Sequence, residues 1–311
     1  MLRLLSRATL LSLPFVLLAI LVAIVDPFDC LGLSSVVAEQ VKFVVAQPLH
    51  NPLWKVQKFR SAPQSRLILG DSSMASLNAA DIRAASGQDY FNFAYGGGTL
   101  AEAIDTYWLA ARSVHLEAVY IGIGLINFNE YQNLNRVPEA LAIVSSPLRY
   151  LTNRLVVAAA FLSAYGALSP HTLDLTTPSI DRQAFWRFQL DEAAPQLLHE
   201  YRFPRTSAAR LQALAADCRR HGTRLVIVIP PTSIELQRRF VELGREQDEA
   251  RFKSFVRTLG TVYDFDIPNE FTRERTNFID PFHTVDDHMV IGEVWGNRPH
   301  YAQYSTVPAS R

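Results

Sequence analysis

A serine near the start of the chain stands in a setting that suits nucleophilic catalysis. The tetrapeptide Gly70-Asp71-Ser72-Ser73 directly follows the apolar run 66–69. A serine at a turn from strand to helix presents its hydroxyl above the sheet edge, and the helix N-terminus offers N–H donors to a developing anion. Because glycine, aspartate and serine are also ordinary turn residues, this tetrapeptide alone does not separate a catalytic turn from a plain one.

A second candidate segment lies near the other end of the chain, where residues 277–283 read Asn-Phe-Ile-Asp-Pro-Phe-His. Asp280 precedes His283 by three positions, with Pro281 stiffening the connection. A carboxylate in this place can orient the imidazole through one ring nitrogen while the other nitrogen faces a serine. Taken alone, this segment is also compatible with the capped start of a helix. We expect this segment and the serine turn each to lie where a strand of the sheet ends, which favours a joint site.

Two further segments between them suit the stabilisation of an anion. Residues 92–99 hold three consecutive glycines, which permit the backbone to approach a ligand closely and to aim N–H groups at it. Residues 122–129 follow the next predicted strand and include Asn127, whose side-chain amide can donate to the same oxygen.

In the order and spacing of these four segments, the chain resembles the SGNH (GDSL-type) hydrolase superfamily. The resemblance covers about residues 66–296, apart from an insertion described below. The resemblance implies that Ser72 is the nucleophile, with Asp280 and His283 completing the triad. It also implies an oxyanion hole formed by the backbone amides of Ser72 and Gly97 and by the side chain of Asn127.

The third segment departs from the family pattern, which is typically Gly-x-Asn-Asp. Here two residues separate Gly124 from Asn127, and no aspartate follows, so Asn129 is the alternative oxyanion residue.

Other interpretations of these residues are less favoured. Ser73 competes with Ser72 as nucleophile, but the family register and the turn position favour Ser72. The run Asp286-Asp287-His288 invites a metal site, yet three adjacent residues at a helix start cannot all converge on one ion. Gly122-x-Gly124 lacks the third glycine of a dinucleotide fingerprint, and the chain has no Gly-x-Ser-x-Gly elbow. We expect neither a metal nor a cofactor.

The elements that would position these residues alternate along the chain. Apolar, β-branched runs at 66–70, 118–124, 224–230 and 261–266, with a short strand at Tyr90, are typical of strands covered on both faces. Helices are predicted at 99–113, at 206–221 (capped by Thr206 or Ser207 and closed by Gly222) and at 233–259. The alternation predicts an α/β fold with a mostly parallel sheet, and we expect a flavodoxin-like three-layer sandwich.

Residues 131–205 break the alternation and are too long for a structureless loop, so we expect a helical insertion. Within it, the apolar stretch 155–168 is too short to cross a bilayer. A buried packing helix is the first interpretation, and an interfacial or partner-docking helix is the alternative.

The N-terminus carries an uncharged apolar stretch at residues 8–25, preceded by Arg3 and Arg7. As a helix it would rise about 27 Å, enough to cross a hydrocarbon core. The positive charges before it predict a cytoplasmic N-terminus and an extracytoplasmic remainder. The rival is a cleaved signal peptide, since Val36-Val37-Ala38 resembles a cleavage site, but that site lies far beyond the apolar stretch.

The composition of the chain limits the classes of partner, the number of domains and the disulfides that we expect. Thirty Lys+Arg balance thirty Asp+Glu, so no basic patch predicts a nucleic-acid partner. With 49% hydrophobic and 11% aromatic residues the chain can bury a large core, as one large domain or two ordinary ones. Cys30 and Cys218 cannot form a disulfide framework, and we expect two unpaired thiols.

These observations predict a transmembrane anchor (1–29), a juxtamembrane lead-in (30–65) with a short helix at 36–46, an SGNH-like domain (66–300) and a C-terminal tail (301–311). The resemblance and the anchor together imply a bacterial inner-membrane protein whose catalytic domain lies in the periplasm. It would act as an O-acyltransferase or esterase on an envelope polysaccharide, beside a multi-spanning membrane acyltransferase. The alternatives are a lipolytic esterase and an inactive SGNH-like scaffold that binds glycan or a membrane partner.

Overall fold

The computed structural model describes residues 2–32, 36–169, 181–296, 298 and 300–306, with only the backbone described at residues 2–6, 8 and 9. The chain divides into two compact units. One comprises Met1–Ala62 and Arg136–Pro178, and the other comprises Pro63–Asn135 and Ser179–Arg311. The segment 131–205, which the sequence groups as one insertion, is therefore divided between them.

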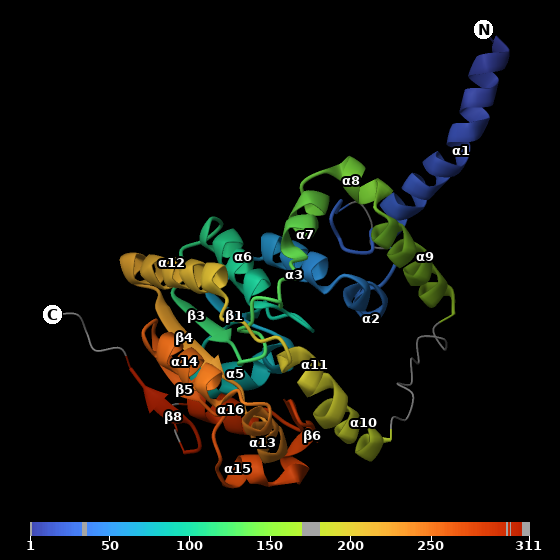
Figure 1. Ribbon diagram of the computed structural model, residues 1–311. Helices are drawn as coiled ribbons and strands as arrows, with labels where there is room; N and C mark the ends of the chain where they lie inside the picture. The colour runs from blue at the N-terminus through green and yellow to red at the C-terminus, as the bar shows by residue number, and fades with distance from the viewer. Residues whose placement is uncertain (1, 33–35, 170–180, 297, 299, 307–311) are drawn as a thin grey trace. The chain divides into compact units, whose positions relative to one another are not determined.

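The second unit is built on a six-stranded sheet of order β2-β1-β3-β4-β5-β8 (Figure 1). The first five strands are parallel, and β8 pairs with β5 in the antiparallel sense. The predicted α/β fold with a mostly parallel sheet is confirmed, and the order 2-1-3-4-5 is that of flavodoxin-like doubly wound sheets. The strands are β1 Arg66–Leu69, β2 Phe91–Asn92, β3 Ala118–Gly122, β4 Arg224–Ile229, β5 Thr261–Asp264 and β8 Gln303–Ser305.

Alternate side chains of these apolar strands enter a core on each face of the sheet. On one face Ile68, Tyr120 and Val228 pack with Trp295, whose ring stacks on that of Tyr120 at 4.7 Å. The other face buries the intervening residues, such as Val119 and Ile227. Because both faces are covered, the strands are near-continuously apolar, which is why the sequence reveals them.

Helices and a small hairpin complete this unit. Helix α5 contacts α16, and α6 contacts both β1 and α12. The helices are α4 Ser72–Ala75, α5 Ala79–Ser86, α6 Leu100–Ala111, α10 Arg182–Phe188, the π-helix η2 Gln189–Ala193, α11 Ala194–Leu198, α12 Arg205–His221, α13 Ile234–Glu242, α14 Glu246–Arg257, α15 Glu270–Arg273, the 3-10 helix η3 Arg275–Asn277 and α16 His288–Val294; the hairpin pairs β6 Phe278–Asp280 with β7 His283–Thr284.

Two helix predictions need correction. The helix expected over 233–259 is two helices, because Gly244 adopts a left-handed conformation (φ +69°) between α13 and α14. Helix α12 begins at Arg205 after Pro204 and has no side-chain cap, so neither Thr206 nor Ser207 caps it, although Gly222 ends it as expected.

Two strand predictions also change. Residues 301–311 are not only a tail, because β8 forms the edge of the main sheet beside β5. His283 does not end a strand of the main sheet, because it belongs to the separate β6–β7 hairpin.

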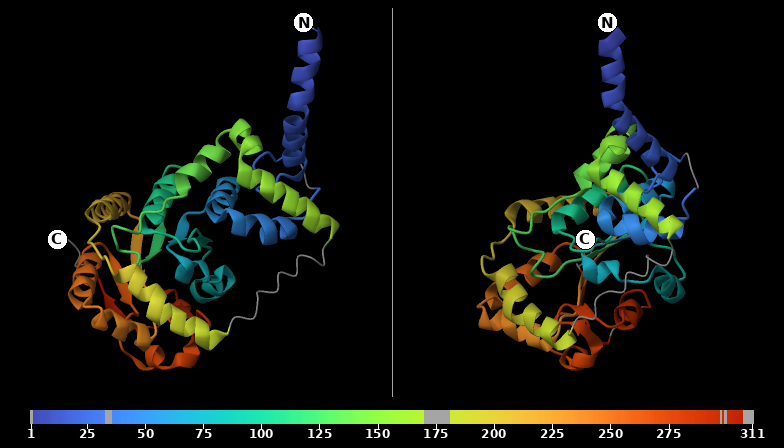
Figure 2. Two further views of the ribbon diagram at one scale, coloured as in Figure 1. Left: turned by 45° about the vertical axis from the view of Figure 1, so that its right-hand side comes forward. Right: turned by 90° about the vertical axis from the view of Figure 1, so that its right-hand side faces the viewer.

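The first unit is helical in the residues that the structure describes. Helix α9 packs on both α1 and α2, while it exposes Phe161, Leu162, Tyr165 and Leu168. The apolar stretch 155–168 is therefore a helix, buried on one side only. The helices are α1 Leu2–Val25, α2 Glu39–Leu49, α3 Asn51–Ser61, α7 Val137–Val144, α8 Pro147–Thr152 and α9 Arg154–Leu168 (α7 to α9 are green in Figures 1 and 2).

Asp26 organises the end of α1. The residue has a positive φ of +41°, and its buried carboxylate accepts hydrogen bonds from the backbone N–H groups of Cys30, Leu31 and Gly32. The Tyr150 hydroxyl donates to the same carboxylate at 2.7 Å. The turn after α1 is thus fixed by one buried charge. Cys30 in this unit and Cys218 in the other are both free thiols.

Across the described residues, no helix combines the length and the apolar character that crossing a membrane requires. The membrane-spanning segment over residues 8–25 stays a prediction from the sequence.

Thr99 tests the local stability of the sheet unit. Its Oγ1 accepts from the N–H of Glu102, and the Glu102 carboxylate accepts from the N–H of Thr99, which forms a capping box on α6; Oγ1 also donates to the carbonyl oxygen of Leu134 at 2.6 Å. Thr99→Ala removes both Oγ1 bonds and should lower the free energy of unfolding by about 1–2 kcal/mol. Urea denaturation measures this, with the exposed Thr258→Ala at the end of α14 as the control, for which we expect only a few tenths of a kcal/mol. Equal losses in the two variants would contradict the capping role.

Candidate active site

Ser72 is held by a tight turn at the carboxyl end of β1. Gly70 has a φ of +142°, and a Cβ there would lie 2.9 Å from the carbonyl oxygen of Gly122, so only glycine fits. Asp71 then caps α4 by accepting the N–H of Ser73 at 3.0 Å, which makes Ser72 the first residue of this helix. The predicted strand-to-helix position of Ser72 is confirmed.

His283 is held by the β6–β7 hairpin. At the turn of this hairpin, Asp280 accepts hydrogen bonds from the N–H groups of Phe282 and His283 at 2.8 and 3.2 Å. Its carboxylate also lies 3.0 and 2.9 Å, through Oδ1 and Oδ2, from Nδ1 of the His283 ring. One buried carboxylate thus sets both the backbone and the ring orientation of His283.

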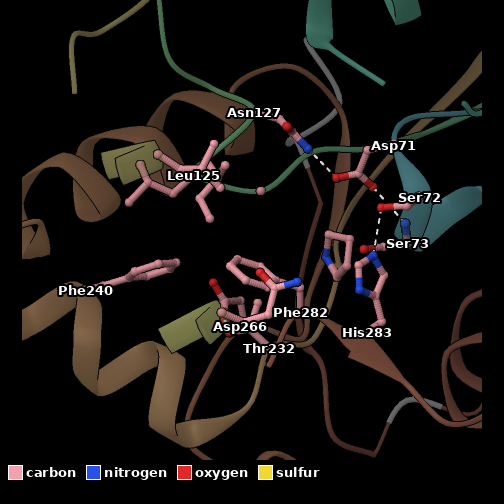
Figure 3. Close-up of a pocket in the computed structure, with 15 residues that line it drawn as sticks. Asp71, Ser72, Ser73, Leu125, Asn127, Thr232, Phe240, Asp266, Phe282 and His283 are labelled. Atoms are coloured by element: carbon pink, nitrogen blue, oxygen red, sulfur yellow. Dashed lines mark hydrogen bonds between the residues drawn. The ribbon is translucent and has the colours of Figure 1, made fainter. Parts of the chain in front are cut away.

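The structure brings Ser72 and His283 into contact. Ser72 Oγ lies 2.7 Å from Nε2 of His283, across 211 positions of sequence. Figure 3 shows this contact as a dashed line. The imidazole meets Ser72, while Ser73 donates its backbone N–H to Asp71. The predicted grouping of Ser72, Asp280 and His283 is therefore present in the structure.

The surroundings of His283 raise its pKa above the ordinary value of 6.5. Burial acts to lower the pKa, but the hydrogen bond and negative charge of Asp280 oppose it, and the charges of Asp71 and Asp287 add to this effect. The carboxylates thus stabilise the imidazolium that would form if the ring took a proton from Ser72.

Asn127 meets a partner that the sequence did not suggest. Its Nδ2 donates a short hydrogen bond to Oδ2 of Asp71, beside Ser72 (Figure 3). Burial raises the pKa of Asp71, while the Ser73 N–H, the charge of His283 and the Asn127 amide act to lower it. An asparagine amide carries two N–H donors; one bonds to Asp71, and the other has no partner within the described part of the chain.

The other two oxyanion candidates lie elsewhere. Asn129 is buried, donates to the carbonyl oxygen of Leu197 and accepts from the N–H of Arg202, so its side chain is occupied in tying its own loop to helix α11 and to the segment after that helix. Gly97 is exposed in its turn, whereas a Cβ on Gly98 would lie 2.7 Å from the carbonyl oxygen of Gly70. The glycine that packs against the serine turn is Gly98, because only a residue without a side chain fits there.

A cavity of about 230 Å³ opens beside the Ser72–His283 pair. Among the described residues that line it, none comes from segment 92–99, whereas the β3 loop contributes residues 124–127. The lining that the sequence did not indicate includes Gln189 from η2, Leu197, Thr232, Phe240, Asp266 and Phe282. Thr232 follows β4 and Asp266 follows β5, so both stand where ligands bind in such sheets.

The run Asp286-Asp287-His288, considered above as a metal site, makes local hydrogen bonds at the start of α16. Asp287 accepts a hydrogen bond from the hydroxyl of Thr284 at 2.8 Å, and Asp286 accepts from the N–H of His288. Within the described residues, no group of three or more His, Cys, Asp or Glu side chains is arranged to hold a metal ion.

Comparison with known proteins leaves the family open: no protein-family model matches the chain, and no curated protein matches its sequence. The geometry itself provides a hydroxyl in contact with an imidazole, a carboxylate on the far ring nitrogen and a side-chain amide beside them. Such an arrangement can activate a serine for attack on an acyl carbon.

The titration of His283 tests this electrostatic description. We expect the ring to titrate with a pKa above 6.5, because Asp280 stabilises its charged form, and Asp280→Asn should lower that pKa by roughly one pH unit. NMR of the imidazole protons measures both values. Asp286→Asn removes the same charge nearby without a contact to the ring, so it should change the pKa less than Asp280→Asn does. Equal effects would show that Asp280 acts only as a distant charge.

Proposed function

We propose that this chain is an SGNH-type serine enzyme that transfers or removes an O-acyl group on a cell-envelope polysaccharide outside the cytoplasm. The observation that carries the proposal is the continuous set of contacts from Ser72 Oγ to His283 Nε2 at 2.7 Å and from His283 Nδ1 to Asp280 at 2.9 Å.

The reaction that these contacts support has two steps. His283 Nε2 takes the hydroxyl proton as Ser72 Oγ bonds to the ester carbonyl carbon; the bond from that carbon to the alcohol oxygen then breaks, and His283 returns the proton to the leaving alcohol. In the second step water, or a hydroxyl of a second sugar, gives its proton to His283 and attacks the acyl-serine. Ser72 then leaves and recovers a proton. Water yields an esterase and a sugar hydroxyl yields a transferase.

Asn127 is the best-supported side-chain donor for the oxyanion. Its amide is fixed by Asp71 one residue from the nucleophile, and it lines the same cavity as Ser72. The N–H of Ser72 belongs to the first turn of α4, where backbone donors have no partner in their own helix. The two together offer prepositioned donors to developing negative charge.

The cavity favours a small acyl group over a lipid. Its volume of about 230 Å³ lies below the range of roughly 300–1,000 Å³ that is usual for drug-sized ligands. A short acyl group with part of a sugar fits this space better than a long acyl chain. The lipolytic alternative is therefore the weaker one.

The location outside the cytoplasm rests on the N-terminal sequence. Arg3 and Arg7 precede the apolar stretch, and α1 exposes large apolar side chains such as Leu10, Phe15 and Ile20. A membrane acyltransferase remains the proposed partner, with the exposed side of α9 as a candidate contact.

Ser72→Ala tests the chemistry. Because the nucleophile is removed, we expect kcat for 4-nitrophenyl acetate to fall by about 10⁴-fold or more. Intact-mass measurement of the wild type with a donor ester should show an acyl adduct that the variant lacks.

Ser73→Ala is the matched control, because the same hydroxyl is deleted one position away with the backbone bond to Asp71 retained. Its kcat should stay within a few-fold of the wild type. Unchanged hydrolysis and unchanged glycan acyl content in cells expressing Ser72→Ala would overturn the enzyme and favour the inactive scaffold.

Asn127→Ala tests the oxyanion donor. We expect kcat to fall by about a hundredfold or more while KM changes little, because the amide would act mainly in the transition state. Steady-state kinetics with the same aryl ester separate the two constants. A raised KM with an unchanged kcat would assign Asn127 to substrate binding instead.

A further inference from the structure

One carboxyl group in the cavity has no part in the proposed chemistry. Asp266 follows β5 and lines the cavity together with Thr232, on a different side from Leu125 (Figure 3). In the same view Phe240 lies at the end of the cavity away from His283.

Asp266 is only partly satisfied by the protein. The Thr232 hydroxyl donates a short hydrogen bond to its Oδ1, and no hydrogen bond to its Oδ2 occurs within the described part of the chain. The side chain is nevertheless buried, with 4% of the residue exposed. Oδ2 is not among the buried side-chain atoms that lack a partner, so this oxygen is accessible at the cavity and can accept a hydrogen bond from a ligand there.

The nearest ammonium group does not satisfy this carboxylate. Lys253 Nζ bonds to the backbone carbonyl of Asp266 and pairs with Glu249 and Asp264 at 2.8 and 3.3 Å. Burial raises the pKa of Asp266 to about 7, against the opposing charge of Lys253.

We propose that Asp266, with Thr232 beside it, is the site that binds a hydroxyl group of the sugar that carries or receives the acyl group. The inference rests on the proposed function and adds the specificity-determining residue for its polysaccharide. Bound in this way, the sugar would place a neighbouring hydroxyl or ester oxygen toward Ser72 in the same cavity.

The chemistry of the lining favours a sugar over a cationic alcohol. A carboxyl group whose pKa is raised by burial attracts a cation less than a surface carboxylate does, yet it accepts a hydrogen bond from a hydroxyl and, when protonated, donates one. Phe240 and Phe282 add apolar ring surface, and Gln189 adds an amide. Ligand sites combine apolar walls with a few placed polar groups in this manner.

Paired substrates test the inference on the full-length protein. The probes are 4-nitrophenyl acetate, which has an aromatic alcohol without further hydroxyls, a panel of acetylated oligosaccharides of xylose, glucose and N-acetylglucosamine, and acetylcholine. Asp266→Ala should lower kcat/KM for the saccharide esters by about tenfold or more, because a hydrogen bond to a carboxyl group is lost. The kcat/KM of Asp266→Ala for 4-nitrophenyl acetate should stay within about twofold of the wild-type value. For the saccharide esters, the kcat/KM of Asp266→Asn should lie between those of the wild type and of Asp266→Ala.

Glu270→Gln is the control, since it removes an exposed carboxylate four positions away that does not line the cavity. It should leave both kcat/KM values unchanged. Retained aryl-ester activity in the Asp266 variants shows that they fold.

The outcomes separate the two proposals. If Ser72→Ala abolishes aryl-ester hydrolysis but the Asp266 variants affect all esters equally, affect none, or affect acetylcholine most, the proposed function stands and the sugar site is overturned. A wild type that hydrolyses the aryl ester but no saccharide ester likewise overturns the sugar site alone. If Ser72→Ala has no effect on any ester, or the wild type hydrolyses none, the proposed function fails and the sugar site with it.

Discussion

The candidate site depends on one contact, the 2.7 Å approach of Ser72 Oγ to Nε2 of His283. Neither partner sits on a long element: the serine begins a four-residue helix, and the histidine lies in a two-residue strand. Their positions are therefore set by what surrounds them. Gly70 lets the chain turn sharply after β1, and Asp280 fixes the hairpin from within. Rigid support of this kind is what a preorganised site requires.

Carboxylates do most of the positioning around this contact. Asp280 orients the imidazole, Asp71 caps α4 and holds the amide of Asn127, and Asp266 bonds to Thr232 across two strand-end loops. Each is desolvated to some degree and each has hydrogen-bond donors supplied by the backbone or a side chain. Of these three side chains, only Asp266 has a carboxyl oxygen without a hydrogen bond in the described residues, which is why we assign it to a ligand.

The sequence predicted the parts of the fold that follow from local pattern. Apolar runs located β1, β3, β4 and β5, because a strand buried on both faces has few polar residues.

The sequence did not predict features that depend on strand pairing or on tertiary packing. The β6–β7 hairpin and edge strand β8 are too short to have a period, and Gly98 is indistinguishable from Gly97 until Gly70 packs against it. Asn127 lines the cavity beside Ser72, and its role as oxyanion donor stays a prediction; its bond to Asp71 could not be predicted without the tertiary structure. Asp266 and Thr232 carry no motif at all, and only their positions after neighbouring strands bring them together.

The late place of His283 in the chain has a consequence for biosynthesis. A ribosome makes the polypeptide from the N-terminus, so Ser72 emerges more than two hundred residues before His283. Until the β6–β7 hairpin is made, a nascent chain therefore lacks the imidazole that the proposed reaction requires.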